Sequence, residues 1–453
     1  MKIAKIVPIP KQGDPELCTN YRPISLLTGF SKILEKLVHA RTVSFLRDNE
    51  ILNNSQFGFR ENCNTTHAIL SLINQVNLSI DKKLHTIGIF LDFSKAFDTV
   101  NHDILLHKLS HYGIRGKALE WFESYLSNRT QYVCLNNIKS QSRKVECGVP
   151  QGSVLGPLLF VIYVNDFYKS SSKLSFILYA DDSNLFASHK DPQTLLNTVN
   201  TELKSVYNWI KANKLSLNLS KTNYMLFSNT INNLPGPITI NNTDINKVQS
   251  MKFLGVHIDC KLSWKNHINQ MCKVISRNIG VINRLKWTLP PKILLSLYST
   301  LVLPHLTYGI LAWGNSPQYL MDRVLLLQKK AMRVINHSSY NSSTDSLFKV
   351  NHVLKVQDIY RLSLATFMFQ YHNNSLPHAF HGMFKTNNEM HKYPTRSSTS
   401  FHLPLTRTLL VKDSFLFSGP KLWNSLPKEL TSVATIYTFK RKLKTSLISL
   451  YNN

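Results

Sequence analysis

Two apolar runs of strand length lie on either side of the four residues Tyr179–Asp182. Residues 174–178 precede these four residues and residues 185–187 follow them, which is the pattern of a β-hairpin with polar residues at its turn. A third β-rich apolar run, residues 86–91, ends in Asp92. These runs predict a buried strand and a neighbouring hairpin.

Amphipathic stretches separate the apolar runs. Residues 30–47 place apolar side chains at helical spacing, with Ser31 as the expected N-cap, and residues 192–213 form a second amphipathic helix. The alternation of strands and helices through residue 259 predicts a mixed α/β first unit. Beyond it the pattern becomes helical, and three helices are expected at about 264–287, 291–303 and 320–336.

The turn of the predicted hairpin carries two adjacent carboxylates, Asp181 and Asp182. Like charges side by side raise each other's pKa, so the arrangement is costly unless a cation is present. A divalent metal is the usual remedy, and hard oxygen ligands suit magnesium. On their own, two aspartates in a turn are more often a solvated loop than a metal site, so the rest of the sequence has to decide.

Asp92 and a loop rich in glycine and proline change this balance. Alone, Asp92 would be interpreted as a strand-terminating cap, but with a carboxylate pair on a neighbouring hairpin it has the layout that a two-metal site requires. Residues 148–157, GVPQGSVLGP, form a constrained loop between the two carboxylate positions, and Pro157 suits the first turn of the apolar helix that follows. Three matched segments in this order favour a polymerase.

Together these motifs resemble the reverse transcriptases of non-LTR (LINE-type) retrotransposons, closest to the jockey and CR1 groups. The segment at 148–166 discriminates most, because retroviral enzymes and intron maturases carry different residues there. The resemblance runs nearly end to end through NYRPIS (20–25), QFGFR (56–60) with Thr66 and Ala68, FLDFSKAFD (90–98), GVPQGSVLGPLLFVIYVND (148–166), YADD (179–182), NWIKANKLSLNLSKTNYMLF (208–227) and FLGVHID (253–259).

The resemblance implies an α+β fold of the right-hand polymerase type. Fingers and a palm with an antiparallel sheet would occupy residues 1–259, a helical thumb residues 260–340, and a basic C-terminal region of unknown role residues 341–453. In that last, less regular region residues 391–410 stand out, and residues 414–430 resemble the tail that closes many jockey-like and CR1-like reading frames. The basic stretch FKRKLK (439–444) is interpreted as one face of a terminal helix rather than as a nuclear address.

The resemblance also assigns the catalytic carboxylates. Asp92 and Asp181 would bind two Mg²⁺ ions, with Mn²⁺ as a substitute, and the Phe93 backbone carbonyl would be an extra ligand. Asp182 would support the primer end or the second metal. Asp98 lies past the end of the strand, so a structural hydrogen bond is expected of it rather than metal ligation.

Five further residues match nucleotide-binding positions of the family. Arg22 matches a fingers arginine that reaches the triphosphate, a task that suits the forked guanidinium. Phe97 matches a bulky residue that excludes the ribose 2′-hydroxyl, although a core aromatic is the plainer interpretation and both can hold. Gln151 and Gly152 match the loop that lines the nucleotide and template pocket. Lys221 matches a lysine that protonates or steadies the leaving pyrophosphate.

The charge balance predicts a polyanionic partner. The 453 residues contain 53 Lys and Arg against 26 Asp and Glu, a net charge of +27. Such an excess predicts salt-sensitive binding to nucleic acid, and the family resemblance names an RNA template, a DNA primer and dNTPs. Ribosomal and chromatin proteins are also basic, but they rarely contain 43% hydrophobic residues over this length. Nothing in the sequence indicates a protein partner.

Neither a zinc site nor a membrane segment is expected. The six cysteines are scattered without a Cys-x-x-Cys pair, and the histidines show no zinc-like spacing. The longest apolar run, near residues 154–164, has about half the ~20 residues that a spanning helix needs. The N-terminus is too basic and too soon broken by proline for a secretory signal. We therefore expect a soluble protein of a reducing compartment, in the cytoplasm, the nucleus or both.

The sequence begins at the fingers, so the endonuclease and basic region of a complete element are expected to be missing, as is an RNase H domain. A truncated copy of this kind could be a catalytically silent remnant that only binds nucleic acid, and this is the main alternative to an active RNA-directed DNA polymerase. An intron maturase shares the polymerase core, but residues 148–166 argue against it.

Overall fold

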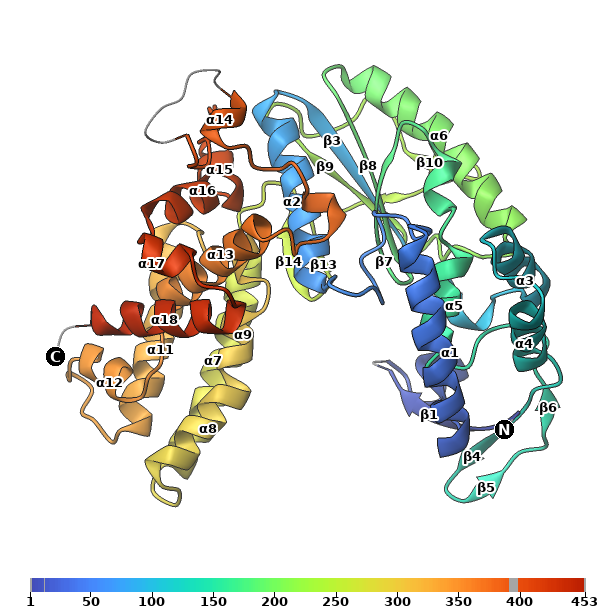
Figure 1. Cartoon of the computed structure of the whole chain (residues 1–453), viewed down its shortest axis with the longest axis horizontal. Coiled ribbons are helices and arrows are strands. Elements are labelled where there is room, and N and C mark those ends of the chain that lie inside the picture. Colours follow the sequence, from blue (N-terminus) through green and yellow to red (C-terminus); the bar gives the residue numbers. More distant parts are fainter. Residues whose placement is uncertain (1, 12, 391–397, 452–453) are drawn as a thin grey trace. The chain divides into compact units, whose positions relative to one another are not determined.

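The computed structural model describes residues 2–11, 13–390 and 398–451, and the chain divides into two compact units (Figure 1). We call them the sheet unit and the helical unit. The sheet unit comprises Met1–Glu61, Ile87–Tyr224 and Asn233–Lys247. The helical unit comprises Asn62–Thr86, Met225–Asn232 and Val248–Asn453.

A five-stranded sheet has most of its residues in the sheet unit. Its order is β12 (Asn246–Lys247), β9 (Asn223–Phe227), β3 (His85–Leu91), β8 (Asp182–His189) and β7 (Ser175–Tyr179). β7 and β8 pair antiparallel, as the predicted hairpin requires, and β12 pairs parallel to β9. The middle strand, β3, is buried along its whole length. A strand covered on both faces has no polar side, which is why its sequence is a continuous apolar run.

A second sheet contains the N-terminal strand. β1 (Ile3–Pro10) pairs antiparallel with β2 (Tyr21–Leu26) and parallel with β4 (Thr130–Leu135). Two short strands, β5 (Ile138–Lys139) and β6 (Arg143–Lys144), pair antiparallel with β4. A separate hairpin joins β10 (Thr239–Ile240) to β11 (Thr243–Asp244).

Three of the five α-helices described in the sheet unit are predicted from the sequence, as residues 30–47, residues 192–213 and the apolar helix that begins near Pro157; the other two, at residues 102–111 and 117–126, are not. The five are α1 (Gly29–Asp48), α3 (His102–His111), α4 (Lys117–Leu126), α5 (Gly156–Tyr163) and α6 (Pro192–Ala212). α6 is capped by Asp191 and packs against β8 (Figure 1). The expected N-cap of α1 is wrong: the side chain of Thr28 accepts a hydrogen bond from the Ser31 N–H, so the helix begins at Gly29. Thr28 offers the same capping oxygen three residues earlier.

The helical unit consists of helices and one hairpin. The hairpin joins β13 (Ser250–Phe253) to β14 (Val256–Asp259), and both turn residues have positive φ. The predicted thumb helices are present as α7 (Lys265–Leu285), α8 (Pro291–Leu301) and α11 (Gln318–Ile335). The other helices are α2 (Thr65–Asp81), α9 (Leu303–Thr307), α10 (Ile310–Trp313), α12 (Asp345–Val350), α13 (Val356–His372), α14 (Asn387–Met390), α15 (Leu409–Lys412), α16 (Phe415–Ser425), α17 (Lys428–Thr431) and α18 (Ile436–Ser449).

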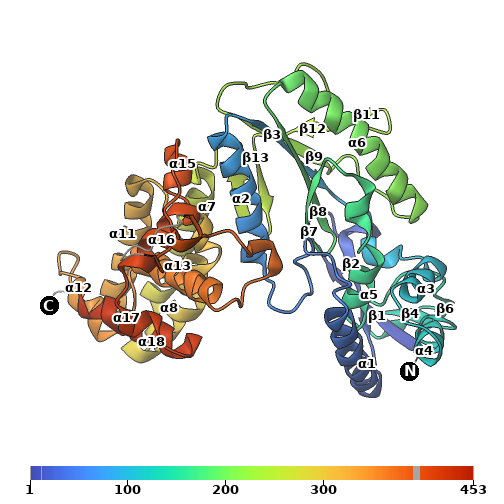
Figure 2. The ribbon, with the colours of Figure 1, turned by 45° about the horizontal axis from the view of Figure 1, so that its top comes forward.

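The C-terminal region is more regular than its sequence suggests. α13 packs against both α16 and α18 (Figure 2). The tail-like segment 414–430 contains α16, where a β-carbon at Gly419 would lie 2.8 Å from Met368 Sδ, so glycine permits the close approach to α13. FKRKLK lies in α18 with Phe439 and Leu443 buried, as expected for the face of a terminal helix. Of the segment 391–410, residues 391–397 lie outside the described residues.

α2 joins the helical unit although it is early in the sequence. Ten of its residues are buried, and it packs against α10 and α15. At its end the Asp81 carboxylate accepts hydrogen bonds from the N–H groups of Arg407 (3.0 Å) and Thr408 (2.9 Å). The helical unit is therefore assembled from segments more than 320 residues apart.

The predicted α+β class is confirmed, with an antiparallel hairpin in the main sheet. The predicted division at residues 259 and 340 stays a prediction. Among the described residues no helix is long and apolar enough to cross a membrane.

Candidate active site

The two adjacent aspartates lie at the tip of the β7–β8 hairpin. Tyr179 and Asp182 form its last pair, which leaves Ala180 and Asp181 as a two-residue turn. Ala180 has φ +56°, in the left-handed region that a residue with a β-carbon rarely adopts. Both carboxylates are exposed at this tip. The turn therefore presents two acids on a backbone that needs external support.

That support comes from residues 55–58, which run beside β7. The Phe57 N–H donates to the Leu178 carbonyl (2.8 Å), and the Leu178 N–H donates to the Ser55 carbonyl (2.8 Å). The side chain of Gln56 is buried, and its Oε1 accepts hydrogen bonds from the N–H groups of Ala180 (3.1 Å) and Gly58 (2.8 Å). One amide oxygen thus joins this segment to the hairpin turn.

Gly58 makes this contact sterically feasible. A β-carbon at position 58 would lie 2.3 Å from the Ala180 nitrogen and 2.9 Å from the Tyr179 carbonyl carbon. Both atoms belong to the backbone, so neither can rotate away. The segment 55–58 and the hairpin turn fit only because residue 58 has no side chain. The sequence predicted no role for Gln56 or Gly58.

Asp92 follows β3 directly, and its backbone is held by the segment 216–222. The Asp92 carbonyl accepts from the Asn218 N–H (2.8 Å), and the Asp92 N–H donates to Thr222 Oγ1 (3.3 Å). The Ser94 N–H donates to the Ser216 carbonyl (2.8 Å), which makes Phe93 and Leu217 a non-hydrogen-bonded antiparallel pair. In such a pair the carbonyl points away from the partner strand. The Phe93 carbonyl is therefore available as a ligand.

Three carboxylates and one arginine share the electrostatic field at this site. Poor hydration, and then the charges of Asp181 and Asp92, raise the pKa of Asp182 to about 6. The pKa of Asp181 is also raised, chiefly by poor hydration; its own N–H lowers it, Asp92 raises it, and Arg22 lowers it. The sheet brings the three carboxylates together, because Asp92 directly follows β3 and Asp182 begins β8, the neighbouring strand.

The oxygen ligands at this site fit a hard cation that takes part of its coordination shell from outside the protein. In the described part of the chain no three His, Cys, Asp or Glu side chains form a group that could hold a metal by themselves. Two carboxylates and a backbone carbonyl supply only oxygen ligands. Mg²⁺ is commonly bound in this way, with waters and substrate phosphates completing its shell. The residues present therefore fit a divalent ion that arrives with a nucleotide.

The glycine-rich loop before α5 is fixed beside this group. The Gln151 Nε2 donates to Asp98 Oδ1 (2.9 Å), and the Gln151 carbonyl accepts from the Ser25 N–H of β2 (2.7 Å). Gly152 has φ +108°, and a β-carbon there would lie 3.0 Å from the Ser25 carbonyl oxygen. The loop thus contacts both β2 and residue 98. Asp98 makes the structural hydrogen bond expected of it, and burial raises its pKa.

Comparison with known proteins identifies this arrangement. A family model described as "Reverse transcriptase (RNA-dependent DNA polymerase)" matches residues 9–258, which contain every site residue named above. The chain belongs to the reverse transcriptase family. Its relatives confirm the resemblance to the non-LTR type. It is 31% identical over 360 residues to the probable RNA-directed DNA polymerase from transposon BS of Drosophila melanogaster, covering 75% of this chain and 39% of that protein.

A second relative is the RNA-directed DNA polymerase from mobile element jockey of the same species, 28% identical over 371 residues. That match covers 79% of this chain and 40% of the relative, so the chain spans about two fifths of the relatives' length. Among solved structures, telomerase from Candida tropicalis in complex with a fragment of telomeric RNA has a TM-score of 0.45 and 14% identity, covering 98% of this chain and 64% of that chain.

In this member of the family the predicted nucleotide-binding residues all belong to the sheet unit. Phe97 is half-buried, its ring 4.7 Å from that of Phe160 and 6.5 Å from that of Phe59, so it is a packed aromatic with one accessible side. Arg22 is exposed on β2, and Lys221 is exposed in the segment that holds Asp92. The Gln151 side chain is bound to Asp98. The catalytic and nucleotide-binding roles of these residues stay predictions.

Proposed function

We propose that the chain is an RNA-directed DNA polymerase that extends a DNA primer on an RNA template with dNTPs. The observation that carries the proposal is the proximity of Asp92, Asp181 and Asp182 in one electrostatic field, within the segment that matches the reverse transcriptase family. Neighbouring negative charges raise the pKa of a carboxylate because they make its ionised form unfavourable, and a bound cation removes that free-energy cost.

Asp92, Asp181 and the Phe93 carbonyl would hold two Mg²⁺ ions, for which Mn²⁺ can substitute. When bound, the ions would lower the pKa of the primer 3′-hydroxyl and neutralise charge on the triphosphate. The chain's own residues position the reactants. Asp182 lies at the end of the hairpin, where it can orient the primer terminus. The hydrogen bonds from Ala180 and Gly58 to the Gln56 side chain keep the hairpin turn and its acids in place. Such preorganisation lowers the free-energy cost of reaching the transition state.

The nucleotide-binding residues would act on the incoming dNTP. Arg22 would pair its forked guanidinium with phosphate oxygens, and its effect in lowering the pKa of Asp181 supports this role. The accessible side of Phe97 would exclude a ribose 2′-hydroxyl. Gly152 lets the loop backbone approach the base pair closely. Gln151 would act through its bond to Asp98, which fixes the loop, and Lys221 would meet the pyrophosphate.

The test is magnesium-dependent dNTP incorporation on a primed RNA template. We expect incorporation by the parent chain and, in Asp181→Asn, a loss on the order of a thousandfold, because a metal ligand and its charge are removed. Asp244→Asn is the matched control: it makes the same change on an exposed residue of β11 and should retain full activity.

Two outcomes would contradict the proposal. Equal incorporation by the parent and Asp181→Asn would show that the hairpin is not the catalytic site. A parent that is folded and binds RNA but incorporates nothing with Mg²⁺ or Mn²⁺ would leave the alternative, a silent remnant that only binds nucleic acid.

A further inference from the structure

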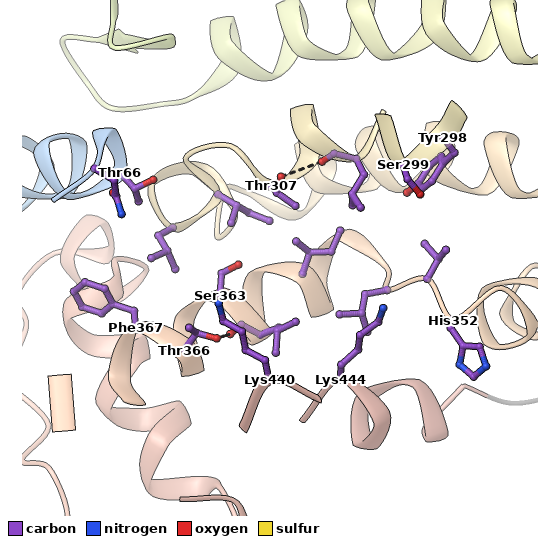
Figure 3. A pocket seen from close by; sticks show the side chains of 18 of the residues that line it. Thr66, Tyr298, Ser299, Thr307, His352, Ser363, Thr366, Phe367, Lys440 and Lys444 are labelled. Atoms are coloured by element: carbon purple, nitrogen blue, oxygen red, sulfur yellow. Dashed lines mark hydrogen bonds between the residues drawn. The ribbon is translucent and has the colours of Figure 1, made fainter. Parts of the chain in front are cut away.

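A groove of about 630 Å³ lies within the helical unit (Figure 3). α8, α9 and α10 supply one wall, and α13 and α18 supply the other. Thr66 and Phe367 lie towards one end of the view, and Tyr298 and His352 towards the other (Figure 3). The groove is formed entirely by residues of the helical unit and contains none of the predicted catalytic or nucleotide-binding residues.

Two lysines give the groove its charge. Lys440 and Lys444 both extend from α18 towards the groove (Figure 3). Neither makes an ion pair among the described residues, and the residues lining the groove include no Asp or Glu. Their spacing of four residues is one helical turn, a rise of about 6 Å. This is close to the separation of successive phosphates in an extended nucleic-acid strand.

The lysines are held in place by the buried residues next to them on α18. Phe439 and Leu443 of α18 are buried, and the Phe439 ring stacks on Phe369 of α13 with centroids 4.7 Å apart. The helix cannot rotate the lysines away from the groove without exposing the side chains of Phe439 and Leu443. The cationic side of the groove is therefore preorganised, which lowers the entropy lost when an anionic ligand binds.

The remaining lining is apolar with hydroxyl groups at intervals. Ser299, Thr307 and Thr366 each donate a hydrogen bond to the carbonyl four residues earlier in their helix. Each hydroxyl therefore presents lone pairs that can accept from an N–H donor of a ligand. The apolar lining comprises Leu295, Leu303, Ile310, Leu311, Val353, Leu354, Ile359, Leu362 and Phe367.

An unpaired strand matches both kinds of lining. Nucleobases present flat apolar faces and N–H donors at their edges, and their phosphates are anionic. In a duplex the base faces are stacked, so only its phosphates would find partners here. The helical unit as a whole carries 28 Lys and Arg against 8 Asp and Glu, which favours a polyanion over an isolated anion.

We propose that this groove binds single-stranded nucleic acid, with successive phosphates on Lys440 and Lys444 and bases against the apolar wall. The inference deepens the proposed function, on which it rests for the expectation that the strand is an unpaired part of the RNA template. The groove would hold the RNA at a point separate from the carboxylates.

The experiment measures binding of a fluorescent unpaired RNA oligonucleotide to the full chain at several salt concentrations. Lys440→Gln/Lys444→Gln is compared with Arg441→Gln/Lys442→Gln, which removes the same charge from exposed positions of α18 that do not line the groove. We expect the first pair to weaken binding about tenfold and to reduce the slope of log K against log salt by about 1.4, because each phosphate contact on a single strand contributes ~0.7. The control pair should lose about twofold or less.

A second variant tests the apolar wall without changing charge. Ser363→Phe places a ring in the groove, and it should weaken binding of unpaired RNA while leaving the salt slope unchanged. Thermal unfolding of each variant, followed by circular dichroism, confirms that it is folded. Tighter binding of RNA than of single-stranded DNA of the same sequence assigns the strand to the template, and equal binding assigns the groove to either strand; both support it.

Three results would overturn the proposal. Equal losses for the two charge-removing pairs would show diffuse attraction by the helical unit rather than a site. Undiminished affinity for fully duplex RNA would show that bases do not enter the groove. The third result concerns an acidic peptide as the ligand. If Lys440→Gln/Lys444→Gln weakened binding of such a peptide but left RNA binding unchanged, the groove would be assigned to a protein partner.

The outcome is separable from the catalytic proposal because binding is measured without synthesis. If the parent incorporates no dNTP but Lys440→Gln/Lys444→Gln weakens RNA binding, the groove stands and the catalytic proposal falls. If incorporation depends on Asp181 while the charge-removing pairs bind RNA equally, the catalytic proposal stands and the groove falls.

Discussion

The two units of the chain use charge in opposite ways. The sheet unit is nearly balanced, with 25 Lys and Arg against 18 Asp and Glu, and it places two carboxylates on one hairpin and a third at the end of a neighbouring strand. The helical unit, with 28 basic against 8 acidic residues, carries most of the net charge and lines its groove with lysines. The sheet unit therefore concentrates like charges that need a cation, whereas the helical unit offers cations to a polyanion.

The two units also differ in what their close glycine contacts hold together. In the sheet unit the tightest glycine contact, at Gly58, fixes the hairpin turn that carries Asp181. In the helical unit, glycine contacts such as that of Gly314 with Tyr360 bring helices together. Equivalent substitutions should therefore damage activity in one unit and stability in the other.

Gly58→Ala should have the largest effect on activity. The new methyl group would lie 2.3 Å from a backbone nitrogen of the hairpin turn, so the turn must move and displace Asp181. We expect dNTP incorporation to fall on the order of a hundredfold, since a displacement of about 1 Å at a reacting group can cost that much. Gly29→Ala is the control, because nothing lies within 4 Å of a β-carbon there. Unchanged incorporation by Gly58→Ala would show that the contact between residue 58 and the hairpin turn is not needed for activity.

Gly314→Ala should destabilise the helical unit by about 1–3 kcal/mol, the usual cost of overpacking. Its β-carbon would lie 2.6 Å from the Tyr360 ring, and that ring is buried and hydrogen-bonded to Ser418. Gly280→Ala, in α7 with nothing within 4 Å, should be neutral or slightly stabilising. Denaturant unfolding measures both variants. A Gly314→Ala chain as stable as the parent would contradict the idea that this contact limits the packing.

Acidification should weaken the helical unit by a smaller amount. Burial lowers the pKa of His67 to about 4, and burial together with His257 lowers that of His267 to about 4, from 6.5. Both rings are neutral when folded, so their contribution is fully present above pH 6.5 and is lost as the pH falls from 6.5 towards 4. Unfolding monitored by tryptophan fluorescence between pH 7.5 and 5 should show a falling midpoint. His267→Phe should flatten the dependence; an unchanged slope would exclude His267 as a cause.

Much of this fold could be predicted from local patterns. β3 is a continuous apolar run because it is the central strand, and the hairpin carries its own signature in YADD. The expected N-cap of α1 lies three residues too late, because Thr28 and Ser31 are both capable caps and only the backbone decides between them. The region after residue 341 looked irregular because several of its helices are short, as in α12 and α15, and interrupted by turns.

The missing parts of the site depend on contacts without a local signal. Gln56 meets Ala180 across 124 residues, and Thr222 meets Asp92 across 130. No sequence spacing marks a buried glutamine whose oxygen accepts from two backbone N–H groups, so its role could not be predicted from the sequence. The motif QFGFR drew attention to the segment, but only the structure assigns it a task. The carboxylates could be predicted because their chemistry is unusual, whereas the residues that support them are ordinary.

The place of α2 has a consequence for synthesis of the chain on the ribosome. α2 is made within the first fifth of the sequence, yet Arg407 and Thr408, which hold its end, are made near the last. The strands and helices of the sheet unit around the hairpin that carries Asp181 and Asp182 are complete by about residue 247. The face of α2 that packs against α10 and α15 has no partner until those two helices emerge. Chain growth therefore completes the sheet unit first, and the helical unit closes last.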